Sequence, residues 1–187
     1  MRRWTLLPAA LAGAAAGGIL VKRVWLEKYR GRKEELETAG RESDLLYTWL
    51  LLEQRRVRLE EYFTAHGYRT VAIQGMNREG RRLFDALQDS GVAAAYGVEI
   101  DNLAAVHETL TVYRLGDDPL PPADCAVICD LERIQEKAAA IGREFPGEVV
   151  SLAQVLAWLL ERRGLKPWDG AVRGWPPEAL LARPNGQ

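Results

Sequence analysis

A glycine-containing turn and two later acids are the residues of this chain whose types and spacing could bind a ligand. The turn reads Gly75-Met76-Asn77-Arg78-Glu79-Gly80, and Glu99 and Asp101 follow the next apolar stretch. In a nucleotide-binding βαβ unit, backbone amides at a helix start receive a phosphate, and an acid about 20 residues later binds the ribose hydroxyls. The spacing therefore predicts a nucleotide site, with Glu99 favoured over Asp101 as the ribose ligand.

One position departs from the dinucleotide fingerprint G-x-G-x-x-G. Its first glycine makes a tight turn, its second lets the backbone approach the phosphate, and its third lets the helix pack on the strand. Gly75 and Gly80 fill the first and third places, but Asn77 stands in the second. Asparagine tolerates left-handed backbone better than most residues, so we expect the turn to form. We also expect the Asn77 side chain to intrude where a pyrophosphate would lie.

Three arginines follow the turn and could neutralise a phosphate. Arg78 is counted with the site, whereas a solvated helix face is the favoured interpretation of Arg81 and Arg82. The candidate cofactor-binding residues are thus Gly75, Met76, Asn77, Arg78, Gly80, Glu99 and Asp101.

Side chains suited to catalysis are scarce elsewhere. His66 stands at a helix end and His107 in a loop or short helix, and a structural or exposed role is favoured for each. The sequence shows no Tyr-x-x-x-Lys pair of the short-chain dehydrogenase kind, no G-x-S-x-G, no H-E-x-x-H and no P-loop. Cys125 and Cys129 fit two small buried thiols in a reducing compartment, and no metal site is expected. A binding role is therefore favoured over catalysis, and no catalytic residue is assigned.

Alternating strands and helices must position these residues. Such alternation predicts a Rossmann-like α/β fold with five parallel strands in the order 3-2-1-4-5 and helices on both faces. A preceding helix, 45–65, would be capped by Ser43-Asp44 and closed by His66-Gly67. The expected strands are 70–74, 93–99, 111–114, 125–129 and 148–150, and the expected helices are 78–88, 103–108, 131–145 and 152–163, the last capped by Ser151.

The N-terminal segment predicts a membrane anchor. Residues 5–21 carry no charge, and Trp4 and Trp25 would lie about 31 Å apart on a helix, close to the thickness of a bilayer core. The basic cluster after this run holds the C-terminal side in the cytoplasm. A cleavable signal peptide ending at 14–16 and a soluble buried helix are the alternatives. Small residues at Ala9, Gly13 and Gly17 would allow two such helices to form a homodimer.

These features divide the chain into four parts. We expect an anchor at 1–26, a charged stalk and amphipathic helix at 27–66, the Rossmann-like domain at 67–163, and a partly disordered tail at 164–187. In that tail, Trp168 and Trp175 could dock on a surface. The net charge of −1 argues against a nucleic-acid partner.

The stretch from Leu46 to Trp158 resembles the small Rossmann-like domains of bacterial surface-polysaccharide gene clusters. Some of these stand behind an N-terminal membrane helix, and others are fused to glycosyltransferases. The resemblance lies in the Trp-Leu helix, the Tyr-Phe before the first strand, the I-x-G-M turn and the Tyr-Gly of the second strand, followed by ADCAVICDLERIQEKAA and EVVSLAQVLAWL. Glu99 stands where the family usually shows Asp, and Asn77 departs from members with glycine there.

The resemblance implies similarity to the nucleotide-binding halves of sugar-modifying enzymes, without a defined reaction. The first hypothesis is a membrane-anchored cytoplasmic accessory module of cell-envelope polysaccharide biosynthesis that binds a nucleotide, with NAD(P) as a candidate cofactor, or a nucleotide-sugar. The second is an NAD(P)-dependent oxidoreductase or sugar-nucleotide-modifying enzyme whose site a dimer partner completes. The third is a ligand-free scaffold that docks a glycosyltransferase.

Overall fold

A computed structural model describes residues 36–100, 109–117, 119–166, 176 and 178–182. The chain divides into two compact units, 1–41 and 42–187. In the first unit the described residues 36–41 are helical, and Arg41 pairs with Glu37 at 3.6 Å. Within the described ranges, no helix is long and apolar enough to cross a membrane. The predicted anchor, its small-residue face, Asp101, His107, the helix 103–108 and both tail tryptophans lie outside those ranges.

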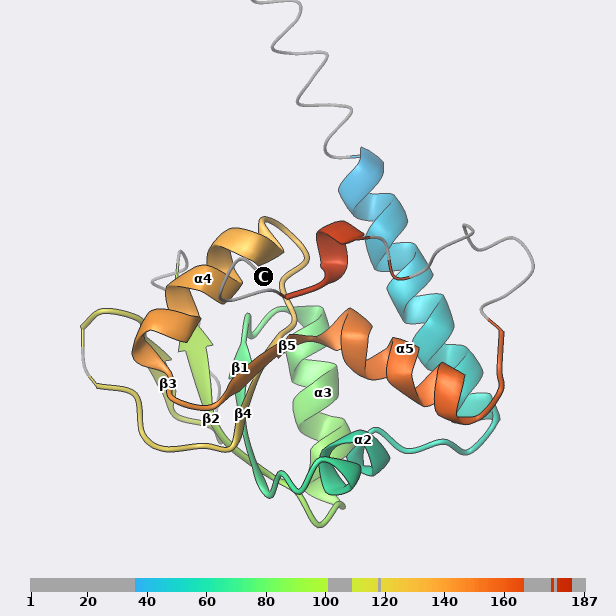
Figure 1. Ribbon diagram of the computed structural model, residues 1–187, viewed down its shortest axis with the longest axis horizontal. Helices are drawn as coiled ribbons and strands as arrows, with labels where there is room; N and C mark the ends of the chain where they lie inside the picture. Colours follow the sequence, from blue (N-terminus) through green and yellow to red (C-terminus); the bar gives the residue numbers. More distant parts are fainter. Residues whose placement is uncertain (1–35, 101–108, 118, 167–175, 177, 183–187) are drawn as a thin grey trace, which may run out of the picture. The chain divides into compact units, whose positions relative to one another are not determined.

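Five parallel strands form the sheet of the second unit, in the order β3-β2-β1-β4-β5 (Figure 1). This confirms the predicted order and direction. The strand β1 is central because its apolar residues are buried on both faces, as a parallel sheet covered by helices requires. The strands are β1 (Thr70–Gln74), β2 (Ala93–Glu99), β3 (Val112–Arg114), β4 (Cys125–Ile128) and β5 (Glu148–Ser151).

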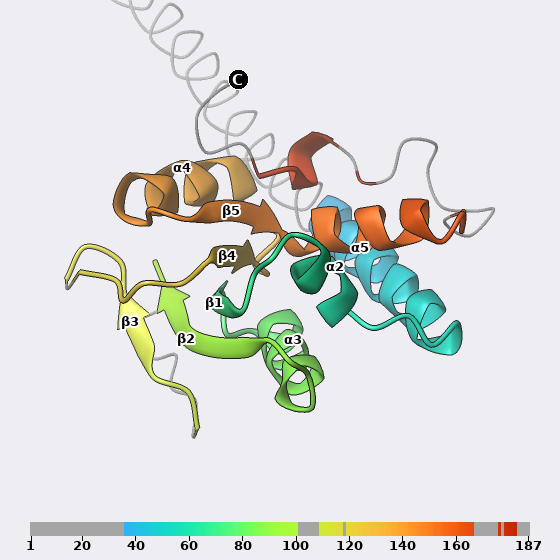
Figure 2. The ribbon, with the colours of Figure 1, turned by 60° about the horizontal axis from the view of Figure 1, so that its bottom comes forward.

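Helices cover both faces of this sheet. The helix α3 (Arg78–Gln88) packs on β1 and β2, while α4 (Ile134–Glu144) packs on β4 and β5. Figure 1 shows α4 on one side of the strands and α3 on the other, and the rotated view of Figure 2 keeps them apart. The helix α5 (Leu152–Arg162) follows β5 and contacts the short α2 (Glu60–Ala65). As predicted, Ser151 caps α5, through a capping box with Gln154.

The predicted helix 45–65 is wrong as one continuous element. Helical residues 42–54 end in a turn, where Arg56 has φ 56° and the Val57 amide donates to the Leu52 carbonyl at 2.9 Å. The break allows the side chains on both sides of it, including Leu52, Val57 and Phe63, to be buried in one core. Ser43-Asp44 lies inside the helix and therefore does not cap it. The predicted end is confirmed, with His66 as C-cap of α2 and Gly67 at φ 78°.

The helix α4 begins at Ile134, three residues later than predicted. The Asp130 carboxylate accepts a hydrogen bond from the Glu132 amide at 2.9 Å, and Arg133, the N-cap, has φ 47°. A side-chain turn of this kind competes with helix formation, so the helix starts only after it.

Part of the C-terminal tail packs on the domain. The 3-10 turn η1 (Glu178–Leu180) contacts α4, and Leu180 is fully buried. Ser151 Oγ donates to the Leu180 carbonyl, and Gln135 Nε2 donates to the Leu181 carbonyl. The Ala182 amide donates to Gln154 Oε1 at 2.8 Å. Residues 178–182 therefore lie against the first turns of α4 and α5.

Candidate functional site

The turn between β1 and α3 requires both of its glycines. Gly75 has φ 83°, a conformation that side chains disfavour, and a Cβ on it would lie 2.9 Å from Asp130 Cβ. A Cβ on Gly80 would lie 2.0 Å from the Gly75 carbonyl oxygen. The first glycine therefore makes the tight turn, and the second allows α3 to pack against the end of β1, as the fingerprint predicts.

Asn77 has a different role from the one its backbone tolerance suggested. Its φ is −72° and its ψ is −165°, so the left-handed residue of the turn is Gly75 and not Asn77. The exposed Asn77 is the N-cap of α3, and its Oδ1 accepts from the Gly80 amide at 3.0 Å. Helix N-terminal amides need such an acceptor. One of the amides at the helix start is therefore bonded to the protein's own carboxamide.

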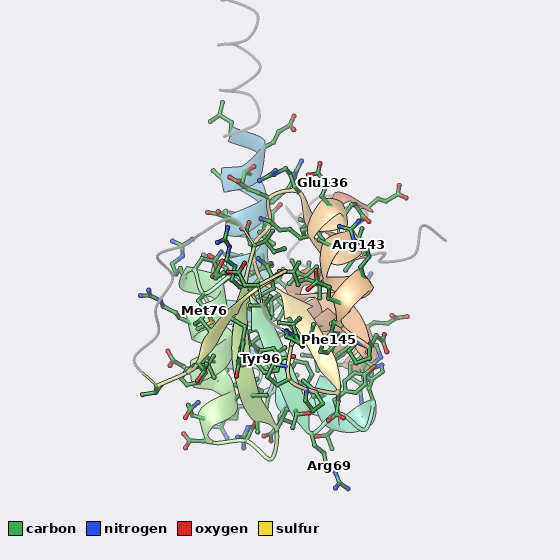
Figure 3. All side chains as sticks on the ribbon, turned by 90° about the vertical axis from the view of Figure 1, so that its left-hand side faces the viewer. Arg69, Met76, Tyr96, Glu136, Arg143 and Phe145 are labelled. Atoms are coloured by element: carbon green, nitrogen blue, oxygen red, sulfur yellow. The ribbon has the colours of Figure 1, made fainter. Side chains whose placement is uncertain are left out.

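The structure brings Glu99 onto this turn. Glu99 ends β2, is 8% exposed, and accepts a hydrogen bond from the Met76 amide through Oε1 at 2.7 Å. The buried Met76 side chain, labelled in Figure 3, packs on Gly97, where an added Cβ would lie 3.1 Å from Met76 Cγ. Two features that are distant in the sequence, the glycine turn and the predicted ribose-binding acid, thus form one site.

The three arginines differ in their contacts. Arg78 lies at the helix start, with NH2 3.0 Å from Glu79 Oε1 and 3.6 Å from Glu42 Oε2. Arg81 Nε donates back to the Met76 carbonyl at 3.2 Å. Arg82 pairs with both Glu53 oxygens at 2.9 and 3.0 Å, and its guanidinium lies 5.1 Å from the Trp49 ring centre. Arg78 and Arg81 therefore belong to the turn, whereas Arg82 links α3 to the helical residues 42–54.

Two further polar residues, Gln74 and Asp130, lie at the ends of β1 and β4, and Lys137 of α4 pairs with Asp130; sequence reasoning missed all three. Gln74 ends β1, is 1% exposed, and its Oε1 is buried with no hydrogen-bond partner among the described residues. A buried polar atom left in this state costs roughly 1–3 kcal/mol. Lys137, on α4, has a 5% exposed side chain, and its Nζ lies 2.5 Å from Asp130 Oδ2. The signal for Gln74 and Asp130 was a polar residue directly at the end of an apolar strand.

The sheet register explains why these residues are close. Gln74 pairs with Ile128, and Asp130 follows two residues later, so both belong to the same face of the sheet. That face is opposite to Ile73, which approaches Gly80 of α3, and it is therefore the face that α4 covers. The chain leaves β1 toward β2 and leaves β4 toward β5, in opposite directions. Ligands of open α/β sheets bind beside the carboxyl ends of strands at such a switch point.

Among the described residues, His66 lies away from these strand ends, and the two cysteines are inert. Exposed His66 hydrogen-bonds the Tyr62 carbonyl at 2.8 Å and stacks on Tyr68. Cys125 and Cys129 are free and buried, and burial raises the pKa of both thiols, which opposes thiolate formation. In the described part of the chain, no cluster of three or more metal-binding side chains is found.

No family model matches the chain, and neither the curated proteins nor the solved structures yield a match. The strand order and direction therefore carry the assignment of a Rossmann-like fold. This fold is compatible with nucleotide binding. Membership of the polysaccharide-cluster domains stays a prediction.

Proposed function

We propose that this chain binds a nucleotide at the carboxyl ends of β1 and β2 and acts as an accessory module. The observation that carries the proposal is the hydrogen bond between the Met76 amide and the Glu99 carboxylate. It fixes an acid beside a glycine turn that opens a helix, which is the pairing that ribose and phosphate recognition needs. In this arrangement ribose hydroxyls donate to Glu99, and the phosphate lies at the start of α3.

A nucleoside mono- or diphosphate suits this turn better than NAD(P). A dinucleotide needs bare backbone where its pyrophosphate crosses the turn, and Asn77 places a side chain there. An acid at the end of β2 also disfavours the 2′-phosphate of NADP, because two negative charges would repel. A nucleotide-sugar, whose pyrophosphate links its nucleoside to a sugar smaller than a second nucleoside, remains within the proposal.

The cellular setting is proposed from the sequence. Residues 4–26 would tether the module to the membrane with its C-terminal domain in the cytoplasm, and a glycosyltransferase of envelope polysaccharide synthesis is the proposed partner. Carbonate extraction of membranes tests the tether. A full-length chain recovered in the soluble fraction would contradict it.

The binding proposal is tested by calorimetry on the full-length chain in mild detergent, with AMP, ADP, UDP, UDP-glucose, NAD and NADP. We expect a mono- or diphosphate ligand to bind, and Glu99→Gln to weaken it about tenfold. The amide would keep the contact to Met76 but lose the charged acceptor, and a hydrogen bond to a charged group contributes about 1.5–3 kcal/mol. Glu61→Gln is the matched control, because Glu61 of α2 pairs with Arg163, the C-cap of α5, away from the candidate site. Equal affinity of both variants would contradict the ribose role of Glu99.

A ligand-free scaffold is the second candidate, and the Asn77 cap favours it. The Asn77 carboxamide already bonds the Gly80 amide, which a phosphate would otherwise use. If no nucleotide in the panel binds, the scaffold becomes the better description.

A further inference from the structure

Lys137 is a buried cation placed beside the glycine turn by α4. Its side chain is 5% exposed, and its ammonium lies 2.5 Å from the Asp130 carboxylate. Asp130 in turn contacts the turn directly, since a Cβ on Gly75 would meet the Asp130 backbone nitrogen at 3.0 Å and its Cβ at 2.9 Å. Asp130 therefore adjoins the turn through its backbone and Cβ, and it holds the ammonium through its carboxylate.

Gln74 provides an independent observation at the same place. Its carboxamide oxygen is buried without a hydrogen-bond partner among the described residues, at the last position of β1 and directly before Gly75. By register it shares the α4-covered face with Asp130. A carboxamide that no protein group holds can turn to present either its oxygen or its N–H to a ligand. The end of β1 thus offers a hydrogen-bonding group that the fold itself does not use.

We propose that Lys137 is the phosphate-binding cation of the candidate site, and that Asp130 holds it until a phosphate replaces the carboxylate. This rests on the proposed function, since the phosphate is that of the nucleotide. Gln74 would donate its N–H to the same phosphate. The Asp130 carboxylate can release Lys137 because its side chain is 33% exposed to water. Its other oxygen keeps the hydrogen bond from the Glu132 amide, so the carboxylate stays solvated and bonded after the release. A phosphate of higher charge competes well with one carboxylate for a buried ammonium.

In this proposal Lys137 supplies the cation of the site, and none of the arginines is needed for it. Arg78 is 66% exposed and already bridges Glu79 and Glu42, and Arg82 is held by Glu53. Lys137 is buried, so its attraction to a phosphate is screened less by water and salt. The start of α3 adds the partial positive charge of the helix dipole.

The test measures ADP, adenosine and inorganic phosphate binding by calorimetry to the full-length chain and three variants. Asp130→Asn should bind ADP at least threefold more tightly, because it removes the competing charge while keeping an oxygen for the Glu132 amide. Lys137→Met should bind ADP at least tenfold more weakly, with adenosine affinity unchanged. Glu61→Gln, which removes one acid from the Arg163 pair, should bind ADP as the native chain does. Thermal unfolding of each variant confirms that it is folded.

The outcomes separate this inference from the proposed function. Native binding of ADP that neither Asp130→Asn nor Lys137→Met alters would overturn the role of Lys137 and leave the nucleotide site standing. If Asp130→Asn does not fold, the loss of ADP but not adenosine affinity in Lys137→Met decides the question alone. Binding of inorganic phosphate through Lys137 without ADP binding would support the cation and overturn the nucleotide as its ligand. No binding of these probes by any chain, together with no binding in the full nucleotide panel, would overturn both proposals.

Discussion

Two glycines and one asparagine determine the shape of the turn, each for a different physical reason. Gly75 adopts a left-handed backbone, Gly80 lies where a Cβ would overlap the Gly75 carbonyl, and Asn77 satisfies the Gly80 amide. The turn is therefore stabilised by hydrogen bonds within the protein itself. The sequence motif predicted where the turn would lie, but it did not predict that Asn77 would act as a helix cap.

Gly80→Ala tests the close approach of Gly80 to the Gly75 carbonyl. The added methyl group would lie 2.0 Å from the Gly75 carbonyl oxygen, and because that neighbour is backbone it cannot move away without distorting β1 or α3. Overpacking typically costs about 1–3 kcal/mol, and we expect a free-energy loss of at least about 3 kcal/mol in urea unfolding. Gly91→Ala is the control, since its Cβ would meet no atom within 4 Å. Equal unfolding midpoints for the two variants would show that α3 is not packed as described.

At the scale of elements, continuous apolar stretches were the most reliable signal. The strands β1 and β2 have the predicted bounds, and β4 differs by one residue, because each is an apolar run bounded by turn residues. The split of the first helix and the late start of α4 were not predictable in the same way. Both depend on left-handed residues, Arg56 and Arg133, that tertiary burial and the Asp130 turn hold in place.

Asp124 joins two elements and makes stability depend on pH. Its Oδ2 accepts from the amides of Arg69 and Thr70 at 2.8 and 2.9 Å and from the Thr70 hydroxyl, which ties the start of β4 to that of β1. The hydrogen bond from the Arg69 amide, then those from Thr70, hold the pKa of this carboxyl below its ordinary 3.8. Between the folded and unfolded pKa values the unfolded chain binds more protons, so stability falls as pH drops.

We therefore expect Asp124→Asn to flatten the acid limb of stability. Urea midpoints measured from pH 6 down to pH 3 should fall less steeply for this variant than for the native chain, because an amide cannot be protonated there. Asp85→Asn, a substitution at an exposed residue of α3, should leave the native slope unchanged. If Asp124→Asn keeps the full native slope, the carboxylate does not supply the acid-sensitive link between β1 and β4.

At the scale of the whole molecule, strand order brings the missed residues together. The order 3-2-1-4-5 was predicted, and it requires the ends of β1 and β4 to be neighbours. What the sequence did not show is which face of α4 is buried, because its run Lys137-Ala138-Ala139-Ala140 has little apolar contrast. The burial of Lys137 and the pairing with Asp130 therefore became visible only in three dimensions.

The C-terminal segment was also more closely integrated than its composition suggested. Proline and tryptophan content predicted a partly disordered tail, yet residues 178–182 contact α4 and hydrogen-bond to residues at the starts of α4 and α5. Leu180 and Ala182 of this segment are both buried in the core, and Leu180 is the larger of the two side chains. The segment lies beside the carboxyl end of β5, where Ser151 bonds the Leu180 carbonyl, so we expect it to contribute to the stability of the whole domain.

Leu180→Ala measures that contribution. Truncating a fully buried leucine removes its transfer free energy and leaves a cavity, which costs about 2–5 kcal/mol where the surroundings cannot relax. We expect the free energy of unfolding to fall by about 2 kcal/mol, near the lower end of this range. A short terminal segment can shift into the cavity more readily than a central helix can. Leu50→Ala makes the same chemical change at a side chain that is 45% exposed, and it should cost less than about 1 kcal/mol. The two variants are compared by urea unfolding followed by tryptophan fluorescence. Equal effects would mean that residues 178–182 detach from the domain in solution, because a leucine that leaves the core loses nothing when it is shortened.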